Sequence, residues 1–220
     1  MKAVVFDLDG TLLDTLDDLA DAVNAALEAS GLPARALDEV RVRVGNGIAN
    51  LMLRAMPGVD ADAVVEDIAD DAEKLRRHKK LLTDFRAYYD AHCEDKTLPY
   101  EGVEHMLSEL KSKHIKTAVV SNKADFAVSK LCENYFGNLI DAAVGENEGG
   151  GLHHQAAGLG DCHKEAVYVG DSEVDIETAA NSGMRCISVL WGFKSREFLI
   201  MHGAETLVKN NDELLVELLT

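Results

Sequence analysis

The stretch that decides the fold lies near the N-terminus and reads Lys2-Ala3-Val4-Val5-Phe6-Asp7-Leu8-Asp9-Gly10-Thr11. Its β-branched and aromatic beginning predicts a buried strand over residues 2–6. Asp7 and Asp9 follow that strand directly, and ligands bind outside the carboxyl ends of strands in open parallel sheets. Two such carboxylates repel each other unless they share a cation or a proton. The alternative interpretation is a loop or helix cap with acids at its tip.

A long helical segment follows this first strand. Apolar residues at helical spacing from Leu16 predict a helix that ends at Gly31, and no convincing strand occurs before about residue 93. Asp60 or Asp62 is expected to cap one helix of this segment, and a polar helix is expected over residues 74–89.

Strands alternate with helices after residue 98. Strands are predicted over residues 115–120, 139–144, 166–169 and 185–190, and helices over residues 103–110, 125–135 and 175–182. This alternation predicts an α/β fold, with a parallel sheet that is covered on both faces. The strand at residues 2–6 belongs with these later strands, so the helical stretch is an insertion. We expect a core of residues 1–14 and 96–220 and an all-helical domain of residues 15–95.

Two further polar groups follow predicted strands. Asp171 comes directly after the strand at residues 166–169, where a metal ligand would lie, whereas Asp175 could equally cap the next helix. Ser121-Asn122-Lys123 comes after residues 115–120 and could hold an oxyanion, or form a turn with a Ser or Asn cap. Carboxylates that converge from two strand ends suit Mg²⁺, which takes a few carboxylates together with substrate phosphate.

Composition excludes several classes of protein. The chain has 220 residues, 47% of them hydrophobic, and a formal net charge of −17, which disfavours binding to nucleic acid or to anionic membranes. No apolar run approaches the ~20 residues of a membrane span, and acidic residues follow Met1 too soon for a signal peptide. The cysteines are widely spaced, which predicts a reduced, cytoplasmic protein without a zinc site. They are Cys93, Cys132, Cys162 and Cys186.

The motifs resemble those of the haloacid dehalogenase superfamily. The run from Asp7 to Asp14 matches its opening signature D-x-D-G-T-L-x-D, Ser121 matches its serine strand end, and Gly170-Asp171-Ser172-x-x-Asp175 matches its closing acidic motif. The loop Val44-Gly45-Asn46-Gly47 and the Ser-Asn-Lys run are most similar to the phosphoglycolate phosphatase group.

The resemblance implies a Rossmann-like doubly wound core with a helical cap over residues 15–95, and a phosphatase mechanism. Asp7 would attack phosphorus and become an aspartyl-phosphate, while Asp9 would protonate the leaving oxygen and then activate water. Ser121 would bind the transferring phosphoryl group. Mg²⁺ would lie on Asp7, the backbone carbonyl of Asp9, and Asp171, with Asp175 organising the site. The substrate would be a small phosphorylated metabolite, contacted by Asn122, Arg43 and Gly47, although Arg43 could instead pair with surface acids.

The chain departs from the family at one position. The family places a lysine before its closing acidic strand, but residues 145–155 contain neither lysine nor proline. Lys164 is a nearby candidate that is also consistent with a solvated loop, and His153 and His154 could supply partial positive charge. We therefore expect weak or absent turnover unless Lys164 lies in the site. A sugar-phosphate phosphomutase, a non-catalytic binding domain and a receiver-type signalling domain are the alternatives, and the chain could be a monomer or a homodimer.

Overall fold

A computed structural model describes residues 1–146 and 165–220 of the chain. The described residues divide into two compact units. One unit consists of Met1–Asp14 together with Leu98–Thr220, and the other consists of Thr15–Thr97. We call them the core unit and the helical unit and describe each by itself.

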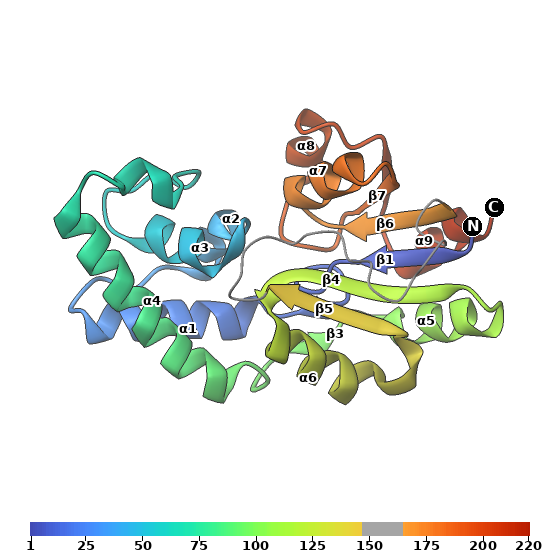
Figure 1. Ribbon diagram of the computed structural model, residues 1–220, viewed down its shortest axis with the longest axis horizontal. Coiled ribbons are helices and arrows are strands. Elements are labelled where there is room, and N and C mark those ends of the chain that lie inside the picture. The colour runs from blue at the N-terminus through green and yellow to red at the C-terminus, as the bar shows by residue number, and fades with distance from the viewer. Residues whose placement is uncertain (147–164) are drawn as a thin grey trace. The chain divides into compact units, whose positions relative to one another are not determined.

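The core unit contains a six-stranded parallel sheet in the order β5-β4-β1-β6-β7-β8. Its strands are β1 (Ala3–Phe6), β4 (Lys116–Ala124), β5 (Ala142–Glu146), β6 (Ala166–Gly170), β7 (Arg185–Val189) and β8 (Thr206–Val208). Phe6 at the end of β1 pairs with Val119 of β4 and Val169 of β6, so these three strands run in register toward one edge. Figure 1 shows their arrowheads pointing the same way. The predicted α/β fold with a parallel sheet is confirmed.

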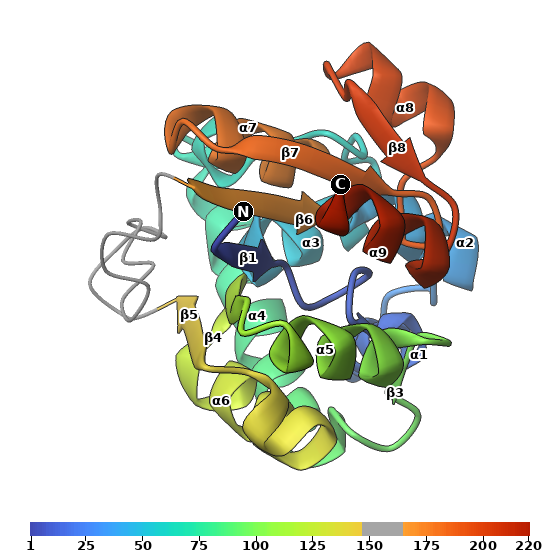
Figure 2. The same cartoon turned by 90° about the vertical axis from the view of Figure 1, so that its right-hand side faces the viewer.

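Helices cover both faces of this sheet, because alternate residues of each strand point to opposite faces. Val4 and Phe6 belong to a large apolar cluster with residues of α5 (Val103–Ser112), α6 (Asp125–Phe136) and α9 (Asn211–Leu219). Ala3 and Val5 belong to a smaller cluster with Ala179 of α7 (Glu173–Asn181). Figure 2 shows α7 on one side of β6, with α5 and α9 on the other.

Several details of the core differ from the sequence prediction. β4 continues to Ala124, with a register shift between Val120 and Ala124, so Ser121 lies within the strand rather than after its end. β5 begins only at Ala142, because a 3₁₀ turn, η2 (Gly137–Leu139), precedes it. The short α8 (Arg196–Met201), β8 and α9 were not predicted. β2 (Leu13–Asp14) and β3 (Leu98–Pro99) pair antiparallel where the chain leaves and re-enters the core unit.

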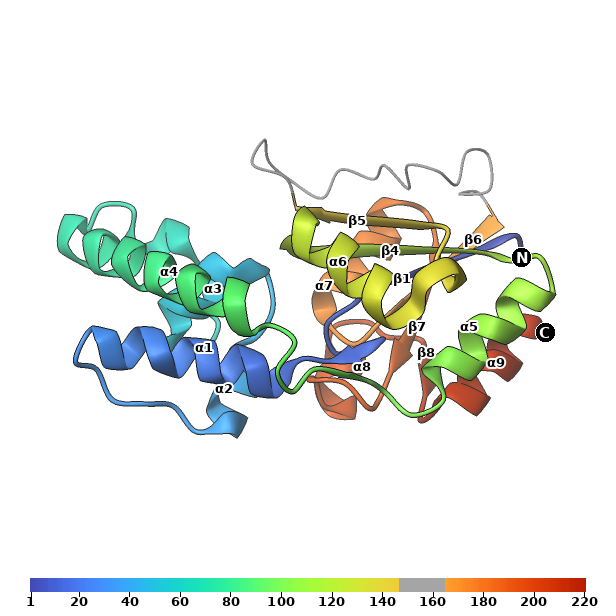
Figure 3. The ribbon, with the colours of Figure 1, turned by 90° about the horizontal axis from the view of Figure 1, so that it is seen from below.

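The helical unit contains four α-helices and one 3₁₀ helix. They are α1 (Leu16–Ala29), α2 (Leu37–Arg43), α3 (Gly47–Ala55), η1 (Val65–Ile68) and α4 (Ala72–His92). α1 and α4 lie side by side (Figure 3), and both bury apolar side chains such as Val23 and Phe85. The expected caps at Asp60 and Asp62 are wrong, since a loop and η1 occupy this region. Asp71 caps α4 instead, because its Oδ1 accepts a hydrogen bond from the Lys74 N–H at 2.9 Å. None of the helices in the described part of the chain has the length and apolar character that crossing a membrane requires.

Candidate active site

The site begins where β1 ends. The backbone N–H of Asp7 donates to the carbonyl oxygen of Val169 at 2.9 Å, which continues the β1–β6 pairing by one residue and fixes the start of the acidic loop. The loop then turns back on itself, because the Gly10 N–H donates to the Leu13 carbonyl oxygen at 2.9 Å. Asp7 is therefore held at the strand end that the sequence predicts for it.

Three carboxylates meet at this edge of the sheet. One oxygen from each of Asp7, Asp171 and Asp175 lies within 4.8 Å of the others. Asp7 is half-buried, whereas Asp171 and Asp175 are buried. We call these three residues the carboxylate cluster. Residues far apart in the sequence form it because β1 and β6 are neighbouring parallel strands.

Backbone groups hold two members of the cluster in place. The Phe193 N–H donates to Oδ2 of Asp171 at 2.6 Å. Oδ2 of Asp175 accepts from the Ser172 N–H at 2.9 Å and from its hydroxyl at 2.7 Å. Ser172 is the N-cap of α7, so Asp175 takes part in a capping box. The two interpretations of Asp175 are therefore compatible, since the residue both caps a helix and belongs to the cluster.

Two glycines make room for the cluster. Gly10 has a φ of +90°, which favours glycine, and a Cβ atom there would lie 2.6 Å from Oδ2 of Asp171. A Cβ atom on Gly170 would lie 2.1 Å from Cγ of Asp175. Any larger residue at either position would displace a carboxylate.

Burial and mutual repulsion both act on these carboxyl groups. The pKa of Asp7 is raised well above its ordinary value, first by desolvation and then by the charges of Asp175 and Asp171. Desolvation likewise raises the pKa values of Asp171 and Asp175, and bonds from Phe193 and Ser172 respectively oppose this rise. A bound cation would relieve the same repulsion.

The donor set fits a hard divalent cation. All three ligands are carboxylate oxygens, which Mg²⁺ prefers, and three close carboxylates carry more negative charge than burial tolerates without a counter-ion. Mg²⁺ also keeps several waters, so a set of three protein ligands leaves positions for substrate oxygens.

Ser121 and Lys123 are both buried, and they lie in the stretch of β4 where its register against β5 shifts. The Ser121 hydroxyl oxygen accepts from the Lys123 N–H at 3.4 Å, and Ser121 is buried, while Asn122 between them is half-buried. Nζ of Lys123 lies 2.7 Å from Oδ1 of Asp9. This ion pair was not predicted, because it joins β4 to the loop after β1 and no local pattern relates the two residues.

A comparison with known families agrees with this geometry. The family model of haloacid dehalogenase-like hydrolases matches residues 1–183. The chain belongs to the haloacid dehalogenase-like hydrolases. The resemblance that the motifs indicated is therefore confirmed, and with it the fold expected of such a hydrolase.

Individual relatives of this hydrolase cover most of its length. It is 31% identical over 201 residues to a phosphoglycolate phosphatase of Pseudomonas putida, covering 87% of this chain and 70% of the relative. It is 33% identical to a phosphoglycolate phosphatase of Cereibacter sphaeroides, covering 97% and 96% of the two chains. A crystal structure of a protein from Lactobacillus delbrueckii subsp. bulgaricus is 34% identical, covers 98% of this chain and 97% of its own, and superposes with a TM-score of 0.88.

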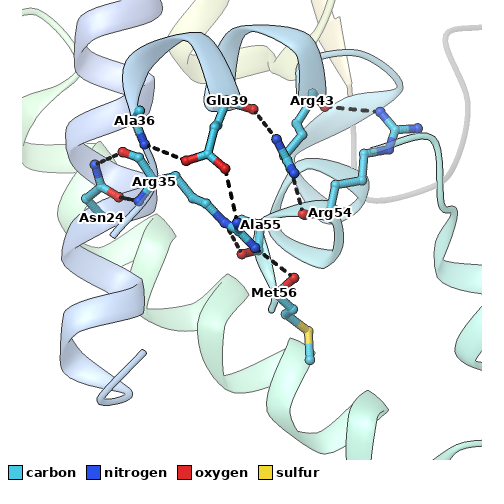
Figure 4. Close-up of polar contacts among 8 residues, drawn as sticks. All are labelled: Asn24, Arg35, Ala36, Glu39, Arg43, Arg54, Ala55 and Met56. Carbon is cyan, nitrogen blue, oxygen red and sulfur yellow. Dashed lines mark hydrogen bonds and ion pairs between the residues drawn. The ribbon is translucent and has the colours of Figure 1, made fainter. Parts of the chain in front are cut away.

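Two predicted site residues of the hydrolase, Arg43 and Gly47, lie in the helical unit. The Arg43 guanidinium donates from Nε to the Arg54 carbonyl oxygen at 3.0 Å and from Nη1 to the Glu39 carbonyl oxygen at 2.7 Å (Figure 4). Arg54 is buried and its Nη1 donates back to the Arg43 carbonyl oxygen at 3.1 Å. Gly47 follows Arg43 across a loop and begins α3 with a φ of +82°. Arg43 therefore binds backbone carbonyl groups of its own unit.

The predicted replacements for the family lysine were Lys164, His153 and His154. All three lie outside the described residues, as does the glycine-rich run of residues 149–160.

Proposed function

We propose that this hydrolase catalyses the Mg²⁺-dependent hydrolysis of a small phosphate monoester similar to phosphoglycolate, through an aspartyl-phosphate on Asp7. The observation that carries the proposal is the carboxylate cluster, which gathers Asp7, Asp171 and Asp175 within 4.8 Å at the carboxyl ends of β1 and β6. The names of the Pseudomonas putida and Cereibacter sphaeroides relatives support phosphoglycolate as the substrate to test first.

The three residues of the cluster, together with the backbone carbonyl of Asp9, would hold the cation. A bound Mg²⁺ supplies positive charge that stabilises the phosphoryl oxygens and keeps Asp7 ionised as a nucleophile.

The reaction would proceed in two steps on the protein's own groups. A carboxylate oxygen of Asp7 forms a bond to phosphorus while the bond to the leaving oxygen breaks, and that oxygen takes the proton of Asp9. Asp9 then takes a proton from water, whose oxygen attacks phosphorus as the bond to Asp7 breaks. Free phosphate and the original Asp7 carboxylate result. Two steps of this kind are each easier than direct hydrolysis.

Ser121 and Asn122 would bind the transferring phosphoryl group or its ester. Ser121 is buried and its hydroxyl oxygen accepts a hydrogen bond from the Lys123 N–H, so the hydroxyl has a fixed position. Such preset donors stabilise developing charge without reorganisation during the reaction.

Arg43 and Gly47 would contact the part of the substrate that leaves, with the helical unit acting as a cap. The two carbonyl bonds of Arg43 give a competing expectation, namely that Arg43 stabilises the helical unit. Arg43→Met distinguishes the two roles. A substrate contact raises KM at an unchanged melting temperature, whereas a structural role lowers the melting temperature at an unchanged KM.

The test of the proposed function is a phosphate-release screen over a panel of small phosphate esters with Mg²⁺. Asp7→Asn serves as the blank, because the amide keeps the shape of the carboxylate but cannot act as the nucleophile. We expect release from phosphoglycolate by the unmodified chain only, and we expect it to be slow unless Lys164 lies in the site. Isomerisation of a hexose 1-phosphate without phosphate release would indicate a phosphomutase. Turnover equal to that of the blank on every ester would overturn the proposal and favour a binding domain.

A further inference from the structure

The feature that the mechanism has not used is the ion pair between Lys123 and Asp9. Nζ of Lys123 lies 2.7 Å from Oδ1 of Asp9, and the side chains are 3% and 17% exposed. The two residues are 114 positions apart in the sequence, and they come from β4 and from the loop after β1. We propose that Lys123 is a positioning residue. It holds the Asp9 carboxyl group in place for proton transfer and away from the carboxylate cluster. This inference rests on the proposed role of Asp9 as acid and base.

The local charge balance supports such a role. Four carboxylates lie at this edge of the sheet, since Asp9 adds to the cluster of Asp7, Asp171 and Asp175. Residues 145–163, where the family would place its lysine, contain no lysine or arginine. Lys123 brings a cation to the edge from a different strand, and its burial means that solvent does little to screen its charge.

Stability alone is a weak reason for this pair. A buried ion pair loses about as much from desolvation as it gains from attraction, and apolar residues of similar volume often serve the fold as well. What such a pair supplies is a fixed geometry for both partners. Lys123 is itself fixed, because it belongs to a central strand next to β1 and its N–H is bonded to the Ser121 hydroxyl.

The orientation of Asp9 explains why this geometry matters. Among the described residues, the group that could hold a metal ion is the carboxylate cluster, and it does not include Asp9. One carboxylate oxygen of Asp9 is instead paired with the Lys123 ammonium. A cation in the cluster would attract any nearby carboxylate. A carboxylate bound to that cation would no longer be available to move protons. The Lys123 ammonium competes for Asp9 and keeps it out of the cation's coordination.

Two esters with different leaving groups test the proposal. Phosphoglycolate expels an alkoxide, which needs the proton of Asp9, whereas p-nitrophenyl phosphate expels a phenolate that leaves without one. The ratio kcat/KM reports steps up to expulsion of the leaving group. We expect Lys123→Met to lose about 100-fold in kcat/KM on phosphoglycolate, within the usual range for general acid catalysis. The loss on p-nitrophenyl phosphate is expected to be at least tenfold smaller, and Asp9→Asn should show the same selectivity.

Lys116→Met is the matched control. Lys116 belongs to the same strand and also lies 2.7 Å from a carboxylate oxygen, that of Asp141, but both side chains are exposed. It should leave both kcat/KM values unchanged. Lys123→Arg keeps the charge and should recover part of the loss on phosphoglycolate. Equal losses of kcat/KM on the two esters would overturn the proposal, because Lys123 would then act on the charge of the phosphoryl group. The absence of any loss on either ester would overturn it as well.

A thermal double-mutant cycle separates this proposal from the proposed function. We expect Lys123→Met and Asp9→Asn each to lower the melting temperature, and the double variant to lower it by less than their sum. Additive shifts would mean that the pair does not form and would overturn the proposal. If the unmodified chain hydrolysed neither ester, the proposed function and the catalytic role of Lys123 would both be wrong, while the cycle would still report the pair.

Discussion

The backbone N–H of Phe193 donates a hydrogen bond to Oδ2 of Asp171, with 2.6 Å between nitrogen and oxygen. Asp171 follows β6 and Phe193 follows β7, so two neighbouring strands together fix one oxygen of the carboxylate. Gly192 permits this approach, because a Cβ atom there would lie 2.3 Å from Cβ of Asp171. A hydrogen bond to the ionised form favours the carboxylate, which is the form that binds a cation.

Asp171→Asn is expected to stabilise the metal-free protein and to weaken its binding of Mg²⁺. Above about pH 8, where the Asp171 carboxyl is ionised, removing its charge from the cluster should raise the melting temperature of the metal-free protein. The same change removes a proposed ligand, so we expect the Mg²⁺ affinity to fall at least about tenfold, or ~1.4 kcal/mol. Thermal unfolding with increasing Mg²⁺ measures both effects. Asp38→Asn is the control, because the Asp38 side chain is 92% exposed, and it should change neither quantity. An undiminished response to Mg²⁺ in Asp171→Asn would remove Asp171 from the metal site.

The stabilising effect of Mg²⁺ is expected to grow as the pH rises. Burial raises the pKa of Asp175 to about 6 and that of Asp171 to about 8, from an ordinary value of 3.8. The metal-free fold therefore keeps protons that the unfolded chain releases. This contribution to stability is complete below about pH 4 and is lost as the pH rises toward about 8. Mg²⁺ binds the ionised carboxylates, so the melting temperature should rise more on addition of Mg²⁺ at pH 8 than at pH 5. A shift that is the same at both values, or larger at pH 5, would contradict this prediction.

Gly10→Ala is expected to damage the carboxylate cluster, whereas Gly183→Ala should not. Both glycines have positive φ values, +90° and +66°, so alanine costs about 1–2 kcal/mol of backbone strain at either position. A Cβ atom added at Gly183 would enter open space, but at Gly10 it would meet the Asp171 carboxylate. Urea unfolding should show a larger loss for Gly10→Ala, and only this variant should also weaken the response to Mg²⁺. Equal losses would mean that strain alone decides both positions.

Asp18→Ala is expected to destabilise the helical unit. Asp18 is 2% exposed, and its carboxylate accepts hydrogen bonds from the N–H groups of Lys96 and Thr97 and from the Thr97 hydroxyl. These bonds tie the start of α1 to the end of the unit. Removing a charged acceptor from buried donors should cost about 2–3 kcal/mol in the free energy of unfolding, measured in urea. Asp17→Ala is the matched control, since Asp17 is the exposed neighbour on the same helix, and it should cost less than about 0.5 kcal/mol. Similar costs for the two variants would contradict the role of Asp18.

Much of the fold could be predicted because it depends on local patterns. Short apolar runs, separated by segments whose apolar residues recur at helical spacing, predicted β1, β6 and β7 within a residue or two. The same reasoning predicted a helical insertion after β1. The end of β4 could not be predicted, because the polar residues 121–123 fall in a register shift and the strand continues past them through pairing of Ala124 with Glu146 of β5. The helix caps were wrong at Asp60 and Asp62 because acids in a loop have the same local signature as acids at a helix start.

The sequence by itself determined that Asp7 and Asp171 lie at the same edge of the sheet, because each follows an apolar strand and parallel strands end at one edge. That the two acids meet was decided by the tertiary structure, which makes β1 and β6 neighbours. Only the tertiary structure decided what surrounds these acids. The Phe193 N–H and the Lys123 ammonium reach the site from β7 and β4, and no local pattern relates them to Asp171 or Asp9. The physical reason is that position along a strand is a local property, whereas the partner of a buried charge is set by the neighbouring strands.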